Sequence, residues 1–146
     1  MTGYVVDASV AVKWLVEEVL SDAAAALLDD DSTLVAPPLL FAEVANALWA
    51  VRRRGDIAAA DLAEAVETLR AAPVSIPVSM SDLTSATTRL ASDLGHPVYD
   101  CFYLALAIHT QYPVVTADTR FHDKVRRHPY LSDRILHLAD LSAEEA

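Results

Sequence analysis

Two aspartates stand at the ends of short apolar runs that have the composition of β-strands. Asp7 directly follows Tyr4-Val5-Val6, and Asp118 lies two residues beyond Val114-Val115-Thr116. In an open sheet of parallel strands, ligands bind beyond the carboxyl ends of the strands, near the point where the strand order reverses. The two carboxylates are therefore expected at one edge of a sheet, where they can bind a cation or act on a substrate.

Two further acids interrupt apolar segments, where an unpaired charge is costly. Glu43 has no Lys or Arg within a helical turn on either side, and Asp100 directly precedes the apolar run 101–108. A divalent cation would offset this cost by holding several negative oxygens together. Because the donors are hard oxygens, the expected ion is Mg²⁺ or Mn²⁺, whereas zinc favours His and Cys.

Each of these acids also has a purely structural interpretation. Asp7, Asp100 and Asp118 could cap the helices that follow them, and Glu43 could face solvent on a polar helix side that it shares with Asn46. Two strand ends, one helix start and one helix interior can nevertheless converge on one pocket, which favours a joint site over coincidence. Such a cluster predicts at least one carboxyl group whose pKa is raised by mutual repulsion.

The elements that must position these acids alternate along the chain. Short strands are expected at 4–6, 33–36, 74–78, 113–116 and 134–138, with helices between them. These strands are apolar throughout, as in a parallel sheet covered on both faces. The sequence therefore predicts an α/β fold with three layers, α/β/α, around a central, mostly parallel sheet of four to five short strands. Its 146 residues fit a single domain, 1–146.

Composition excludes several classes of protein. A hydrophobic fraction of 53% excludes intrinsic disorder despite a net charge of -10. No apolar run approaches the ~20 residues of a membrane span, and no secretory signal is recognisable. The single cysteine, Cys101, cannot form an internal disulfide, so a cytoplasmic location is expected. The glycine-rich motifs of nucleotide-binding folds are absent.

The positive charge is concentrated in two short windows on an otherwise acidic chain. One window holds Arg52, Arg53 and Arg54, and the other holds Arg120, Lys124, Arg126, Arg127 and Arg134. These clusters could be solvated helix ends, because cations favour helix C-termini. They could instead be local phosphate contacts beside the acidic pocket, made by Arg52, Arg53, Arg54, Arg120, Arg126 and Arg127.

Four segments, in order along the chain, resemble the PIN-domain ribonucleases, most closely the VapC-type toxins of bacterial toxin–antitoxin pairs. The matching segments are VDASV (6–10), EVANAL (43–48), YDCFYLALA (99–107) and VTADTRF (115–121). The resemblance extends over nearly the whole chain. One departure is Cys101, where the family usually has a small residue; it concerns packing more than chemistry.

The resemblance implies a metal-dependent endoribonuclease with a PIN-like fold. The family's metal-binding acids match Asp7, Glu43, Asp100 and Asp118, and its nearby polar positions match Ser9 and Thr116. Asn46 is a further candidate for a supporting polar residue. We expect Asp7, Asp100 and Asp118 to be metal ligands and Glu43 to be a ligand or to orient a water.

The resemblance also implies partners. These are single-stranded or looped RNA as substrate, a cognate VapB-like antitoxin laid in a hydrophobic groove, and a second copy of the chain in a homodimer. Candidates for lining such a groove are Trp14, Leu15, Leu39, Leu40, Trp49 and Val51.

Three other functions compete with this interpretation. A catalytically inactive PIN-like module would bind RNA or protein without cleaving. A receiver-like signalling domain needs adjacent acids after its first strand, and a haloacid-dehalogenase-like phosphatase needs a second Asp where this chain has Ser9. The presence of all four acids favours the active nuclease.

Overall fold

The central sheet has five strands that all run parallel. The computed structural model describes residues 2–29 and 31–145. The strands follow the order β3-β2-β1-β4-β5. Their bounds are β1 (Gly3–Val6), β2 (Thr33–Val35), β3 (Val74–Ser75), β4 (Val114–Thr116) and β5 (Ile135–His137). The predicted α/β architecture with a sheet of four to five short strands is thus confirmed, and the sheet is entirely parallel.

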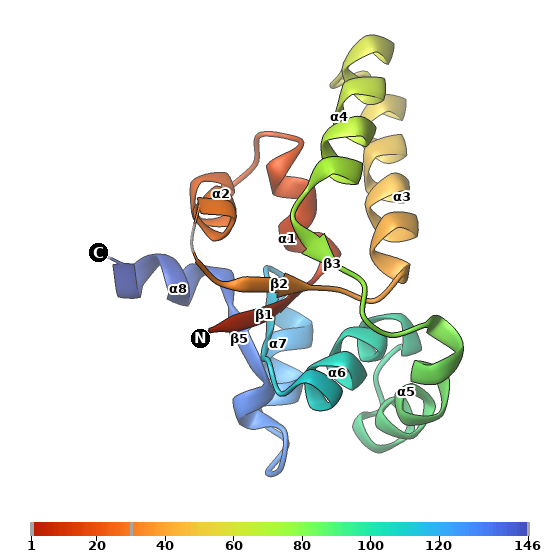
Figure 1. The fold of residues 1–146 in the computed structure, drawn as a ribbon, viewed down its shortest axis with the longest axis vertical. Coiled ribbons are helices and arrows are strands. Elements are labelled where there is room, and N and C mark those ends of the chain that lie inside the picture. Colours follow the sequence, from red (N-terminus) through yellow and green to blue (C-terminus); the bar gives the residue numbers. More distant parts are fainter. Residues whose placement is uncertain (1, 30, 146) are drawn as a thin grey trace.

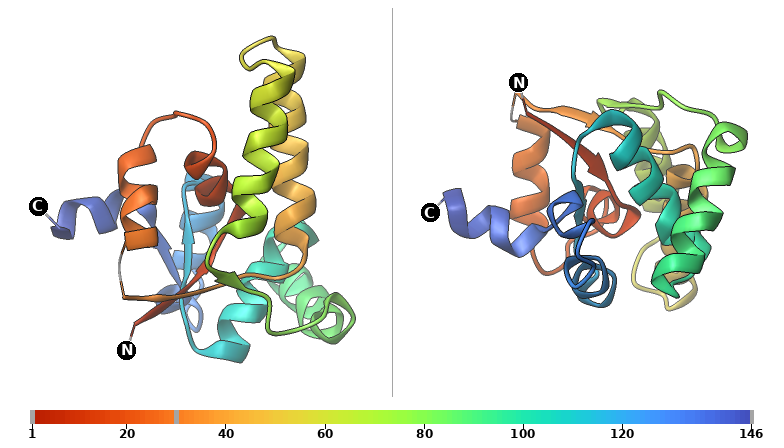
Figure 2. Two further views of the ribbon diagram at one scale, coloured as in Figure 1. Left: turned by 45° about the horizontal axis from the view of Figure 1, so that its top comes forward. Right: turned by 90° about the horizontal axis from the view of Figure 1, so that it is seen from below.

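Helices cover both faces of this sheet (Figures 1 and 2). The connections on one face are α1 (Ala8–Ala11), η1 (a 3₁₀ turn, Val12–Trp14), α2 (Ser21–Asp29), α3 (Leu39–Arg53) and α4 (Ala59–Ala71). Those on the other face include α5 (Met80–Leu94), α6 (Val98–Thr110) and α7 (Thr119–Arg126), followed by η2 (Ser132–Arg134). After β5, α8 (Leu138–Glu145) packs against β5 and α2. Connections between parallel strands are right-handed, so the helices change face when the chain changes its direction across the sheet. The chain moves from β1 to β3 toward one edge and then continues with β4 and β5 toward the other. The reversal point of the sheet therefore lies between the neighbouring strands β1 and β4.

The core explains why the two central strands are almost entirely apolar. Val5 and Val6 of β1 and Val114 and Val115 of β4 are all fully buried, because both faces of these strands are covered. Helix α6 packs between the sheet and α5 and is buried on most sides, as its continuous apolar run predicts. None of the helices in the described part of the chain combines the length and the hydropathy that a membrane span requires.

Helices α3 and α4 form an antiparallel hairpin that extends away from the sheet (Figure 1). The buried residues of α3 are Leu40, Val44, Leu48 and Val51, one apolar stripe at helical spacing. The helix ends before Gly55, whose φ of 82° is the left-handed conformation that glycine adopts without strain. This arrangement places Glu43 near the base of the hairpin, beside the sheet, and Arg52 to Arg54 at its tip.

Candidate active site

Asp7 lies at the reversal point of the sheet, at the carboxyl end of the central strand β1. Val6 pairs with Val115 of β4, and the Asp7 backbone N donates to the Val115 carbonyl at 3.2 Å. This register brings Asp7 beside Thr116, the last residue of β4. Asp7 is only 4% exposed.

Two hydroxyl groups donate to the same oxygen of the Asp7 carboxylate. Ser9 Oγ donates to Oδ2 at 2.8 Å, and Thr116 Oγ1 donates to Oδ2 at 2.7 Å. Each hydroxyl also accepts from a backbone N–H, that of Ala117 for Ser9 (2.9 Å) and that of Asp118 for Thr116 (3.0 Å). The two hydroxyl oxygens also lie 3.3 Å from each other, so Ser9, Thr116 and Asp7 form one hydrogen-bonded group. Among the described hydrogen bonds of this carboxylate, none involves Oδ1, so Oδ1 is the oxygen available to a cation.

Burial outweighs these hydrogen bonds in setting the charge of Asp7. The pKa of Asp7 is raised to about 7. Desolvation by burial is the main cause, the Thr116 and Ser9 hydroxyls oppose it, and repulsion from Asp100 and Glu43 adds a smaller part of the rise. The sequence predicted a raised pKa from repulsion, and the structure shows burial as the larger cause. A bound cation would relieve both penalties.

Glu43 faces α6 and takes a hydrogen bond there. The Tyr103 hydroxyl donates to Glu43 Oε1 at 2.7 Å, and Tyr103 is fully buried. Burial raises the pKa of Glu43, the Tyr103 bond lowers it, and repulsion from Asp100 raises it. Burial and the nearby carboxylates also raise the pKa of Tyr103, so its hydroxyl stays neutral and remains a donor. Asn46, one turn further along α3, is exposed.

Asp100 lies inside the first turn of α6, because that helix begins at Val98 and Pro97 occupies the N-cap position. Its capping interpretation is therefore wrong. Asp100 Oδ2 lies 2.7 Å from His96 Nε2, and the Asp100 side chain is 26% exposed. Burial, followed by repulsion from Asp100, raises the pKa of the adjacent Cys101 thiol to about 11.

Asp118 does cap its helix. It occupies the N-cap position of α7, and its Oδ1 accepts from the backbone N of Phe121 at 3.1 Å. Asp7 also occupies an N-cap position, that of α1, but makes no side-chain cap hydrogen bond there. The capping interpretation thus holds for Asp118 and fails for Asp7.

The structure brings Asp7, Glu43 and Asp100 within electrostatic reach of one another. Asp118 contacts this group through its backbone N, which donates to Thr116 Oγ1, while its carboxylate caps α7. Within the described residues, however, no three His, Cys, Asp or Glu side chains form a group that could hold a metal ion as they stand. The donor chemistry fits a hard cation, since the charged donors are carboxylates and one of them is buried without a countercharge. Mg²⁺ is commonly bound by one or two carboxylates and several waters, so it does not need three protein ligands.

The two clusters of candidate arginines lie in different parts of the fold, the first of them at the tip of the α3–α4 hairpin. Arg52 donates to the Ile57 carbonyl (3.2 Å), Arg54 pairs with Asp56 (3.1 Å), and Arg53 lies over the exposed Trp49 ring, 5.3 Å from its centroid. About nine residues of helix, ~14 Å, separate this cluster from Glu43.

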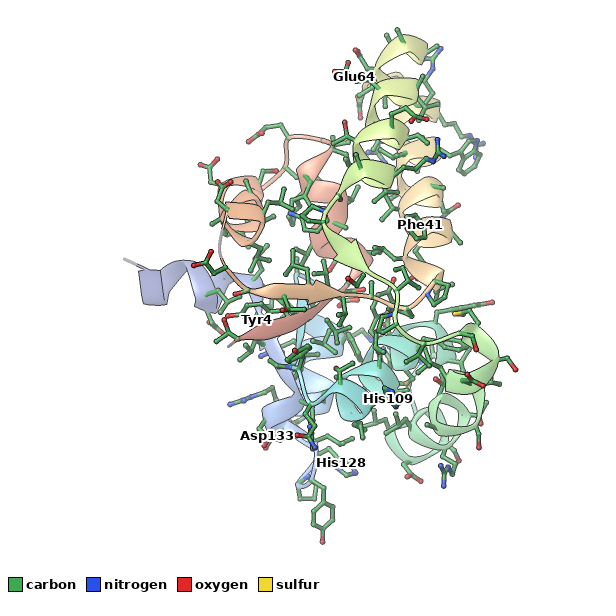
Figure 3. The ribbon with its side chains drawn as sticks, in the orientation of Figure 1. Tyr4, Phe41, Glu64, His109, His128 and Asp133 are labelled. Atoms are coloured by element: carbon green, nitrogen blue, oxygen red, sulfur yellow. The ribbon has the colours of Figure 1, made fainter. Side chains whose placement is uncertain are left out.

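The second cluster divides along α7. Arg120 is exposed in the first turn of α7, two residues beyond Asp118, whereas Arg126 donates to the Ser132 carbonyl (2.8 Å) at its far end, followed by Arg127. Figure 3 shows Glu64, from the α3–α4 hairpin, and His128, next to Arg127, at opposite ends of the molecule.

A groove of about 750 Å³ lies between the η1 segment and the α3–α4 hairpin. Three of the apolar candidates, Trp14, Leu15 and Val51, line it together with acids that include Glu18 and Asp61. The remaining three candidates for the groove do not line it. Leu40 belongs to the core, Leu39 packs against the core, and Trp49 is exposed on α3.

Sequence reasoning missed two residues that contact the acids, Tyr103 and His96. A signal existed for each. A tyrosine inside an apolar helix needs a partner for its hydroxyl, and His96 precedes Asp100 by four residues, the spacing of one helical turn.

Comparison with known proteins identifies one family. The model of the PIN domain matches residues 4–126. The crystal structure of PAE2754 from Pyrobaculum aerophilum is similar, with a TM-score of 0.63, 22% identity, and coverage of 97% of this chain and 96% of that chain. VapBC2 from Rickettsia felis, crystallised with a DNA fragment from its promoter, is also similar, with a TM-score of 0.64, 14% identity, and coverage of 93% and 98%. Comparison with curated protein sequences gives no significant match.

Proposed function

The chain belongs to the PIN-domain family, and from that membership we propose that it is a Mg²⁺- or Mn²⁺-dependent endoribonuclease. The observation that carries this proposal is the group of Asp7, Glu43 and Asp100, which disfavour one another's ionisation at the reversal point of the sheet. Such a group lowers its energy by binding a divalent cation, and a cation between carboxylates is suited to phosphodiester hydrolysis.

The acids and the hydroxyls beside them have defined roles in the proposed reaction. Asp7, Asp100 and Asp118 would hold the cation, which when bound would neutralise phosphate charge and lower the pKa of a water. Ser9 and Thr116 hold the Asp7 carboxylate through Oδ2 and leave Oδ1 to the cation.

Glu43 would hold the cation or act as the general base. The Tyr103 bond to Oε1 fixes the Glu43 carboxylate, so Oε2 is the oxygen that would accept a proton from the attacking water. The raised pKa of Glu43 suits this task, because a base works best when its pKa lies close to the working pH.

The proposed substrate is single-stranded or looped RNA, whose backbone can enter a narrow site. Arg120 is the arginine we assign first to a phosphate, because it is exposed and stands two residues from Asp118. Losing one phosphate contact should reduce the slope of log affinity against log salt by about 0.7. Arg120→Ser should produce that reduction, whereas Arg126→Ser, at the far end of α7, should leave the slope unchanged.

We further propose that the chain is the toxin of a type II toxin–antitoxin pair in the cytoplasm and forms a homodimer. The similarity to the fold of a VapBC chain supports this assignment. The groove beside Trp14, Leu15 and Val51 would accept a segment of the antitoxin, and a basic residue of that segment would complement its acidic rim.

The test is cleavage of a panel of defined RNAs by the purified chain, with Mg²⁺ or Mn²⁺ and with EDTA. Wild type should cleave only with the cation, and Asp7→Asn should lower the rate by about 10³-fold because the transition-state charge loses its support. Glu64→Gln is the matched control, since it also neutralises one acid but lies on α4, near the hairpin tip (Figure 3).

The RNA assay and a phosphate-transfer assay separate the competing functions. Binding of RNA without cleavage, unchanged by EDTA or Asp7→Asn, would support the inactive module and reject the nuclease. Transfer of phosphate from acetyl phosphate to the chain would support a receiver-like domain.

A further inference from the structure

His96 is held rigidly in the turn between α5 and α6. Gly95, with a φ of 62°, ends α5, and its carbonyl accepts from Lys124 Nζ at 2.8 Å. The His96 backbone N donates to the Ala91 carbonyl at 3.2 Å. The imidazole is only 5% exposed and stacks on Phe121, with ring centroids 5.1 Å apart and planes at 21°.

This fixed ring makes a directed contact with an acid of the site. His96 Nε2 lies 2.7 Å from Asp100 Oδ2. A carboxylate only accepts hydrogen bonds, so the imidazole nitrogen is the donor. The bond restrains rotation of the carboxylate about Cβ–Cγ and leaves Oδ1 as the Asp100 oxygen available to a cation.

The stacking partner of His96 connects this contact to a second acid. The backbone N of Phe121 donates to Asp118 Oδ1 at 3.1 Å, while the Phe121 ring supports the imidazole. Phe121 is fully buried, so neither of its contacts can shift without repacking. The orientation of Asp100 on α6 is thereby tied to the start of α7, where Asp118 lies.

We propose that His96 is a positioning residue that orients Asp100 for cation binding. The inference rests on the proposed function, because it assumes that Asp100 binds the ion. Hydrogen bonds of this kind orient ligands, and their loss costs about 10- to 100-fold in metal affinity. The competing role is purely structural: the imidazole would only fill space between α5, α6 and α7.

Two substitutions at one position separate these roles. His96→Phe keeps an aromatic ring against Phe121 but removes the donor, whereas His96→Gln removes the ring and places an amide N–H close to the position of Nε2. Mn²⁺ binding to the full chain, measured by loss of the free-ion signal in electron paramagnetic resonance, is a readout that needs no RNA. Melting temperatures without metal report the packing contribution separately.

Positioning predicts that His96→Phe weakens Mn²⁺ binding by about 10- to 100-fold and that His96→Gln rescues it to within about threefold of wild type. Adding His96→Phe to Asp100→Asn should cause little further loss, because the two residues act through one carboxylate. If His96→Phe does not unfold cooperatively, His96→Leu replaces it in the same comparison.

Several outcomes would overturn the inference. If His96→Phe binds Mn²⁺ with wild-type affinity, or if His96→Phe and His96→Gln weaken Mn²⁺ binding equally, His96 has only a packing role. If Asp7→Asn abolishes Mn²⁺ binding while His96→Phe does not alter it, only the role of His96 fails. If wild type binds no Mn²⁺, the proposed metal site fails, and the role of His96 fails with it.

Discussion

Asp7 and Asp118 follow neighbouring parallel strands and occupy equivalent positions before a helix, yet their carboxylates do different things. Asp7 is buried and accepts from two side-chain hydroxyls, both through Oδ2. Asp118 is half-buried and accepts from a backbone N–H at the start of α7. One aspartate is desolvated by its site, while the other supports the helix that follows it.

The difference follows from what surrounds each strand end. Strand β1 is the central strand, with β2 and β4 on either side, so Asp7 at its end is buried. Its carboxylate accepts from the hydroxyls of Ser9 and Thr116 and not from a backbone N–H of the helix that follows. Asp118 lies two residues beyond the end of β4, where α7 presents its free N–H groups. A strand-end aspartate therefore marks a position at the sheet edge but does not reveal which partner its carboxylate will take.

The largest expected effect is on the pH dependence of stability at Asp7. The folded state holds a proton on Asp7 up to about pH 7, whereas the ordinary pKa is 3.8, so wild-type stability should fall as pH rises through this window. Asp7→Asn stays neutral and can still accept both hydroxyl bonds. In EDTA its free energy of unfolding should exceed that of wild type by up to about 4 kcal/mol at pH 8, and the gain should vanish near pH 4. Urea denaturation of both proteins across this range measures it.

Asp118→Asn is the control for this comparison. Asparagine caps a helix about as well as aspartate, so this substitution should not reproduce the gain at pH 8. A variant Asp7→Asn that is less stable than wild type at every pH would contradict the claim that the charge on Asp7 is disfavoured in the fold.

The sequence was sufficient to predict the places of the five strands, most of whose residues are apolar, and proline and glycine mark the start and end of α3 at Pro38 and Gly55. These features depend on local rules: apolar runs, proline at helix starts and glycine at helix ends. The position of Asp7 and Asp118 at one edge follows from the topology of a parallel sheet, so it was predictable as well. The role of Asp118 as a cap is equally local.

The contacts between distant residues could not be predicted. Tyr103 reads as one more apolar residue of α6 until α3 brings Glu43 against it, and these two residues are 60 positions apart. His96 is four residues from its partner Asp100, but the turn between α5 and α6 decides that the imidazole points at this carboxylate. The sequence alone allows both arginine clusters to lie beside one pocket. The distance between them depends on the lengths and directions of α3 and α7, which the sequence does not reveal.

An intermediate effect is expected when a cation is added. Mg²⁺ or Mn²⁺ at a hundredfold excess over its dissociation constant should stabilise wild type by about 2.7 kcal/mol, or roughly 8 °C in melting temperature. Asp7→Asn should remove most of this shift, because Asp7 Oδ1 is desolvated and available. Asp118→Asn should remove less, because Asp118 Oδ1 already serves the cap. Melting curves with and without the ion measure both, and the absence of a shift in wild type would reject the metal site.

The smallest expected effect separates the two roles of Asp118. Asp118→Ala removes the acceptor for the Phe121 N–H and should lower the free energy of unfolding by about 1 kcal/mol, whereas Asp118→Asn should restore it. Cleavage should be impaired in both variants, because an amide is a poorer ligand for a cation than a carboxylate. Urea denaturation in EDTA measures the first effect, and the RNA assay measures the second. If Asp118→Asn restores cleavage together with stability, Asp118 only holds α7 in place, and the cation would be bound by Asp7, Glu43 and Asp100.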